Sequence, residues 1–179
     1  DNMPAIALTD HGNLMGAFHF IKAINKYNSK VSDDKKIKPI VGCEFYVCDD
    51  HRDKTRRNDG YQIIFLAKNK KGYHNLAKLT SLSYVDGFYY VPRIDKKLVE
   101  LYKQHLIVLT GNMYGEIPSK ILNLGDSQAE DALQWWHTQF GDDLYIELMR
   151  HGEEAEDRAN EKLIYFSEKY EIPVIATNN

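Results

Sequence analysis

The sequence has few cysteines, no long apolar run and little net charge, and each of these shortages excludes a class of protein. Cys43 and Cys48 lie five positions apart, which is neither a zinc-knuckle spacing nor a disulfide framework, so we expect reduced thiols in a cytoplasmic protein. No apolar run approaches the ~20 residues that a membrane span needs, and residues 1–4 do not resemble a signal peptide. The formal net charge of −3 argues against nucleic-acid binding through a strong overall positive field.

The length and composition predict one soluble domain. A chain of 179 residues with 43% hydrophobic residues is sufficient for one core. There is no low-complexity linker and no internal repeat. The sequence opens directly before an apolar run, so we expect residues 1–179 to be a single-domain segment from the middle of a longer chain.

Apolar runs and helical spacings alternate along the chain and predict an α/β fold. We expect strands over 5–8, 39–47, 61–67, 105–110, 144–149 and 172–177, and helices over 13–27, 70–84, 95–102, 116–124, 127–140 and 153–170. Residues 49–59 read as an exposed loop and residues 87–94 as an irregular extended segment. The central strands are rich in Val, Ile and Leu, which indicates a parallel sheet covered by helices, either a barrel or a doubly wound sheet.

Polar residues follow several of these strands, where parallel α/β folds place their chemistry. Alternation along a strand puts Glu147 opposite the neighbouring leucines, and Glu44 opposite Cys43, so both carboxylates would point into a barrel. There they must be paired, hydrogen-bonded or bound to a cation. Asp10, His11, Glu44 and Glu147 could thus form a metal pocket. The alternative is that Asp10 and His11 only cap the next helix.

Other residues permit more than one interpretation. His151, beside Arg150, either forms hydrogen bonds in the barrel mouth or is simply exposed. The basic loop 51–57 either contacts nucleic-acid phosphates or is a solvated loop of mixed charge. Tyr84 and the aromatic run 88–90 either stack on bases or pack within an irregular segment. In the helix over 127–140, we expect one of the two adjacent tryptophans in the core and the other partly exposed.

Several sequence blocks together resemble a known family. They are MPAIALTDHGN at 3–13, KPIVGCEFYV at 38–47, LAKN at 66–69 with GYHNL at 72–76, GFYYVPRID at 87–95, LIVLTG at 106–111 and IPVIATN at 172–178. In this order, over nearly the whole chain, they are similar to the polymerase-and-histidinol-phosphatase (PHP) domain of bacterial DNA polymerase III alpha subunits. The resemblance implies a distorted seven-stranded, TIM-like β/α barrel that binds up to three metal ions through His, Asp, Glu and Cys.

The family's metal site is matched only in part. His11 and Glu44 stand at family ligand positions. Gln62 stands where the family often has a histidine, Asn112 where it often has a cysteine, and Asn179 where the last motif begins with aspartate. Neutral amides cannot replace a thiolate, a carboxylate or an imidazole. The family's initial His-x-His motif is absent from this sequence, so we expect a barrel that lacks its first strand and its final metal motif.

The resemblance therefore predicts a scaffold domain that holds no metal, or at most a single divalent ion such as Zn²⁺, Mn²⁺ or Mg²⁺. The alternative is residual metal-dependent phosphoesterase or 3′–5′ exonuclease activity in the PHP pocket. It also implies that the parent chain is a DNA-directed DNA polymerase, a nucleotidyltransferase of chromosome replication, which uses Mg²⁺ in a domain outside these residues. The implied partners are the rest of the alpha chain, a proofreading exonuclease subunit, the sliding clamp complex, and DNA through the parent chain. Open sheet edges predict a dimer or a low melting temperature for the segment alone.

Overall fold

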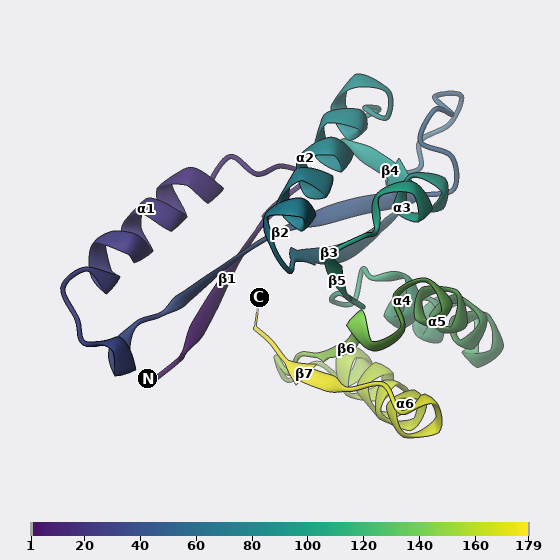
Figure 1. The fold of residues 1–179 in the computed structure, drawn as a ribbon. Helices are drawn as coiled ribbons and strands as arrows, with labels where there is room; N and C mark the ends of the chain where they lie inside the picture. The colour runs from purple at the N-terminus through teal and green to yellow at the C-terminus, as the bar shows by residue number, and fades with distance from the viewer. Residues whose placement is uncertain (1, 179) are drawn as a thin grey trace.

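The computed structural model describes residues 2–178, in which strands and helices largely alternate (Figure 1). The strands are β1 (Ala5–His11), β2 (Lys38–Cys48), β3 (Tyr61–Ala67), β4 (Arg93–Asp95), β5 (Leu106–Leu109), β6 (Leu144–Leu148) and β7 (Val174–Ala176). The helices are α1 (Ala17–Asn28), α2 (Lys70–Val85), α3 (Lys96–Tyr102), α4 (Glu116–Asn123), α5 (Asp126–Phe140) and α6 (Glu154–Tyr170), with short 3₁₀ helices at Asp33–Lys35 and Gly141–Asp143.

The strands form one curled sheet of seven, in the order β1-β2-β3-β5-β6-β7, with β4 paired to β2 beyond the end of β1. Figure 1 shows β1 and β7 at the two ends of this curl, with the helices along its outer side. The order of described strands does not close on itself. The expectation of an incomplete β/α barrel is confirmed.

The expectation of a wholly parallel sheet is wrong, because β3 runs antiparallel to both β2 and β5. The other pairings are parallel. Parallel neighbours need a crossover connection, commonly a helix. Residues 49–60 join β2 to β3 as a loop without a helix, so the chain reverses direction there. As a result, the amino end of β3 lies at the same rim as the carboxyl ends of β2 and β5.

The structure corrects the expected bounds of two local elements, in one case because the pairing partners are distant in sequence. Residues 93–94, expected to be irregular, and Asp95, expected to begin a helix, form β4 because they pair with Tyr46–Cys48 of β2. Helix α1 begins at Ala17 rather than at residue 13, after a turn in which the Asn13 side chain accepts a hydrogen bond from the Met15 amide. Helix α3 is capped by Asp95, whose Oδ1 accepts a hydrogen bond from the Leu98 amide at 3.0 Å.

The main core lies between the outer face of the sheet and the helices. Phe65 of β3 contacts Phe45 of β2 edge to face and lies 6.0 Å, centroid to centroid, from Trp136 of α5. All three are buried, and burying a large apolar side chain stabilises a fold by roughly 1.5–3 kcal/mol. Trp135 is partly exposed beside the buried Trp136, as expected. Strand alternation leaves the inner face to Glu44, Gln62 and Glu147.

Both cysteines are unpaired and buried, in agreement with the expectation of free thiols. Burial raises the pKa of the Cys48 thiol to about 11 and raises the pKa of the Cys43 thiol further. Both are therefore protonated and unreactive at neutral pH. Among residues 2–178, the helices are all too short or too polar to span a bilayer.

Candidate metal pocket and neighbouring sites

His11, the last residue of β1, meets Glu44 within β2, which continues to Cys48. They are register partners on the two parallel strands, and His11 Nδ1 lies 3.3 Å from Glu44 Oε2. The His11 side chain is 62% exposed whereas that of Glu44 is buried. Burial raises the pKa of Glu44, and the opposite charge available on His11 partly offsets this effect. Glu44 Oε1 is buried and has no hydrogen-bond partner within residues 2–178.

Glu147 of β6 contributes a second buried carboxylate to the same electrostatic environment. Its Oε1 accepts a hydrogen bond from the Thr177 hydroxyl at 2.6 Å, while Oε2 has no partner in the described chain. Burial raises the pKa of Glu147, hydrogen bonds from Thr177 and Gly111 lower it, and the nearby negative charge of Glu44 raises it. Buried carboxylate oxygens without donors require a proton or a cation for stability. Glu44 and Glu147 can thus bind either a proton or a cation.

The two amide residues of the pocket bind each other. Asn112, after β5, donates from Nδ2 to Gln62 Oε1 at 3.2 Å. Asn112 Oδ1 accepts from the Tyr114 backbone N–H, and the Gln62 backbone N–H donates to the Tyr114 carbonyl. This network uses polar atoms that would otherwise be free and carries no charge. Asn179, the third amide position, lies outside the described residues.

Asp10 does not join this pocket. It pairs in register with Cys43, so strand alternation places it on the face opposite His11 and Glu44. Its Oδ2 accepts a hydrogen bond from the Gly16 amide at 2.8 Å. The aspartate thus fixes the turn before α1, although α1 has no side-chain N-cap, so the alternative that Asp10 and His11 cap this helix is not confirmed.

His151 lies between the start of α6 and the end of the chain. Its Nδ1 lies 2.9 Å from Glu156 Oε1, and its Nε2 lies 3.0 Å from Asn178 Oδ1. The hydrogen bond with Glu156 raises the pKa of His151. Neighbouring Arg150 is exposed and acts on Glu156 through its charge. This arrangement ties α6 to the segment after β7, which also carries Thr177.

A second group of possible metal ligands was missed in the sequence, where His51 was read as part of a basic loop. Asp50, His51 and Asp95 place ligand atoms within 4.8 Å of one another, so this cluster could hold a metal ion. His51 Nδ1 already lies 2.5 Å from Asp95 Oδ2. Burial opposes ionisation of Asp95, but hydrogen bonds from His51 and Leu98 outweigh it and lower the pKa of Asp95. A metal would have to replace the proton of this pair.

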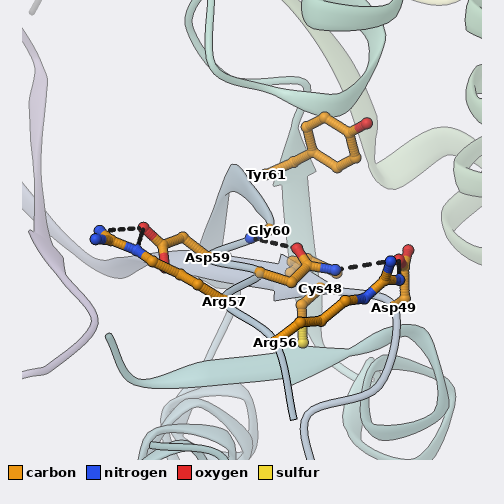
Figure 2. A pocket seen from close by; sticks show the side chains of 9 residues that line it. Cys48, Asp49, Arg56, Arg57, Asp59, Gly60 and Tyr61 are labelled. Atoms are coloured by element: carbon orange, nitrogen blue, oxygen red, sulfur yellow. Dashed lines mark hydrogen bonds and ion pairs between the residues drawn. The ribbon is translucent and has the colours of Figure 1, made fainter. Parts of the chain in front are cut away.

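The loop 49–60 forms one wall of an open polar pocket of about 610 Å³ beside Tyr61 (Figure 2). Figure 2 shows the Arg57 guanidinium on the Asp59 carboxylate, with an Nη2–Oδ2 distance of 2.8 Å. Arg56 lies 3.9 Å from Asp49 and Arg52 lies 3.7 Å from Asp86. Each arginine of the loop thus has an acidic partner, which weakens a reading of the loop as a free phosphate-binding patch.

The buried Arg93 side chain holds this loop in place through hydrogen bonds to backbone carbonyls. Its guanidinium donates to the carbonyls of Gly87 and His51, both at 3.0 Å, and to those of Asn58 and Asp53 at 3.1 and 2.8 Å. Its side chain also lies over the Tyr89 ring, 5.6 Å from the ring centroid. One cation thereby satisfies four backbone acceptors of irregular segments, which explains how a charged loop without secondary structure is held in place.

Comparison with known proteins agrees with this geometry. Residues 1–151 match the PHP domain family. The chain is 42% identical to the DNA polymerase III subunit alpha of Borreliella burgdorferi, with 99% of the chain and 15% of that protein covered. It is 37% identical to the same subunit of Treponema pallidum, with 98% and 15% covered, and 38% identical to that of Thermus aquaticus, with 98% and 14% covered.

The chain spans about 15% of the length of these relatives. Its match to the family includes β1 to β6 and both pocket carboxylates. On the evidence of the curled β/α sheet and of this match, the chain belongs to the PHP domain family.

Proposed function

We propose that residues 1–179 form a scaffold domain within the alpha chain of a replicative DNA polymerase, and that their PHP pocket no longer carries a metal cluster. The observation that supports this most directly is the hydrogen bond between Gln62 and Asn112. Two positions at which the family resemblance implies metal ligands are neutral amides that satisfy one another. A cluster of cations would lack anionic donors on this side of the pocket.

Among residues 2–178, His11, Glu44 and Glu147 do not bring three ligand atoms within 4.8 Å of one another, as Asp50, His51 and Asp95 do. Their one nitrogen and two carboxylate groups would have to move together to hold at most one cation, and the observation that favours such an ion is that both glutamates carry a buried oxygen without a partner in this described part of the chain. Such a donor set suits Mn²⁺, Mg²⁺ or Zn²⁺. A bound ion would polarise a phosphoryl oxygen and lower the pKa of a coordinated water. Residual phosphoesterase or 3′–5′ exonuclease activity is therefore the second candidate function, and the unpartnered carboxylate oxygens favour it.

The decisive experiment measures metal content and nuclease activity together. The intact alpha chain would be dialysed against Mn²⁺ or Zn²⁺, and its bound metal and its release of nucleotides from a 3′-labelled single strand would be measured. We expect less than one bound ion in this domain and no nucleotide release that depends on His11. The control is His74→Ala, which changes an exposed histidine of α2. Two or more bound ions that are lost in His11→Ala but kept in His74→Ala, or nuclease activity with the same dependence, would contradict the scaffold proposal.

The wider role of the parent chain is part of the same proposal. We propose that it is a DNA-directed DNA polymerase that uses Mg²⁺ in another domain, acts in the cytoplasm, and works with a proofreading exonuclease subunit, a sliding clamp complex and DNA. The similarity to DNA polymerase III alpha subunits supports a polymerase as the parent chain. Deleting residues 1–179 from the alpha chain should reduce its folding yield far more than its nucleotidyl-transfer chemistry per folded molecule.

We also propose that residues 1–179 are one PHP segment that lacks the first strand and the last metal motif of the full barrel. The terminal strands β1 and β7 then leave unpaired backbone at the ends of the sheet. Alone, the segment should form dimers or melt at a low temperature. Sedimentation and thermal unfolding of the segment check this, and a monomer that melts at a high temperature would count against it.

A further inference from the structure

An apolar groove lies at the rim of the sheet opposite the candidate metal pocket. It has a volume of about 680 Å³. Its floor comes from the first residues of β2, the last residues of β3 and Ile107 of β5, and its walls come from α1 and α2. The apolar lining residues are Ala17, Phe18, Ile21, Pro39, Ile40, Val41, Leu66, Ala67, Tyr73 and Ile107.

The topology explains why this surface is open. In a regular β/α barrel each strand is followed by a helix that covers it. Here β2 continues through the loop 49–60 directly into β3, so the helix layer passes from α1 to α2 with no helix between them. Phe18 of α1 is 72% exposed and Tyr73 of α2 is 39% exposed. Large apolar side chains that gather in one exposed groove mark a binding surface more often than single exposed ones do.

The rim of the groove carries charge of one sign. Its described lining includes Lys38, Lys68 and Lys70 and no carboxylate. Lys68 is bound to Asp143 at 2.9 Å, while Lys38 and Lys70 are exposed. The whole chain has a net charge of −3, so a rim whose charged residues are all lysines is more positive than the surface as a whole. An occupant with acidic groups beside an apolar face would complement it.

We propose that this groove binds an amphipathic helix of a partner protein, with aspartate or glutamate residues on both sides of its apolar face. The helix would fill the gap between α1 and α2 with side chains at i, i+3, i+4 and i+7. Its carboxylates would pair with Lys38 and Lys70 at the rim. The groove and the metal pocket lie at opposite ends of the strands, so this inference does not depend on the proposed function.

The test uses a synthetic helical peptide with a leucine face and glutamate flanks as the probe, and a peptide with the same leucine face and lysine flanks for comparison. Fluorescence anisotropy measures the binding of each to the 179-residue chain and to the intact alpha chain. We expect the glutamate peptide to bind at least about tenfold more tightly than the lysine peptide. Phe18→Glu, and separately the double variant Lys38→Glu/Lys70→Glu, should each weaken binding of the glutamate peptide about tenfold or more.

Matched controls distinguish binding in the groove from nonspecific binding of the peptides elsewhere on the surface. Leu101→Glu and Lys97→Glu change exposed residues of α3, so they should leave binding unchanged within about twofold. Equal binding of both peptides, no binding of the glutamate peptide, or no effect of Phe18→Glu would overturn the proposal. A dimer of the chain that Phe18→Glu dissociates would instead identify a second copy as the occupant. Protection of a Phe18→Cys thiol in the intact alpha chain alone would identify a segment of that same chain, which also overturns it.

Discussion

Replacing Glu147 with glutamine should stabilise the metal-free chain at neutral pH, although most substitutions of buried residues destabilise. Burial raises the pKa of this carboxyl above its value in the unfolded chain. Its protonated form therefore favours folding, and this contribution is fully present below an unfolded pKa of about 4.3. The contribution is lost as the pH rises through the higher pKa of the folded state. Glutamine resembles the protonated form at every pH.

The magnitude follows from the contacts of the side chain. Oε1 keeps its hydrogen bond from Thr177 after the substitution, whereas Oε2 has no donor within residues 2–178. An unsatisfied buried polar group costs about 1–3 kcal/mol, and more when it is charged. The neutral amide of glutamine retains part of that cost. We expect a net gain of about 1–2 kcal/mol at pH 8, or roughly 2–8 °C in melting temperature for a chain of this size.

Urea denaturation at several pH values between 5 and 8 tests this prediction. The wild-type chain should lose stability as the pH rises, and Glu147→Gln should lose less. Glu100→Gln, at an exposed position of α3, is the matched control and should follow the wild type. A Glu147→Gln variant that is less stable than the wild type at pH 8, or that has the same pH slope, would refute the reasoning. Stabilisation of the wild type alone by millimolar Mn²⁺ would identify a cation bound at Glu147 and favour the second candidate function, residual phosphoesterase or exonuclease activity.

Three further predictions concern the surrounding residues. Arg93→Met should destabilise the chain by about 3–5 kcal/mol in urea denaturation, because four carbonyls lose a charged donor, while the exposed Arg56→Met should change stability by less than about 0.5 kcal/mol. At Glu116, burial raises the pKa, but the charge of Lys96 and three hydrogen bonds outweigh burial and lower the pKa. The wild type should therefore lose stability as the pH falls through this lowered pKa. Glu116→Gln should remove that part of the acid transition. The double variant Gln62→His/Asn112→Cys should bind Zn²⁺ measurably more tightly than the wild type in calorimetric titration, and equal binding would show that the amides are not what limits metal affinity.

Much of the architecture follows from local pattern. The apolar run predicts the strand over 61–67 with the bounds that the structure gives. The family resemblance rests on the same local blocks. These features depend on residues close in sequence, whose spacing is visible without knowledge of the fold.

The candidate site could be predicted only in part. The sequence placed Glu44 and Glu147 on inner faces by alternation, and the structure buries both. It could not choose between a ligand role and a capping role for Asp10, because that depends on which face of β1 points towards the sheet interior. It also missed the contact between His51 and Asp95, which are 44 positions apart.

The sequence by itself determined which donors this chain can offer, since an amide at position 62 or 112 remains neutral in any fold. Only the tertiary structure decided which of these donors meet. The loop after β2 reverses the chain, and this reversal makes β3 antiparallel and brings Gln62 against Asn112. The same reversal leaves the groove between α1 and α2 without a covering helix. Strand direction depends on pairing across the whole sheet, which no local pattern of side chains specifies.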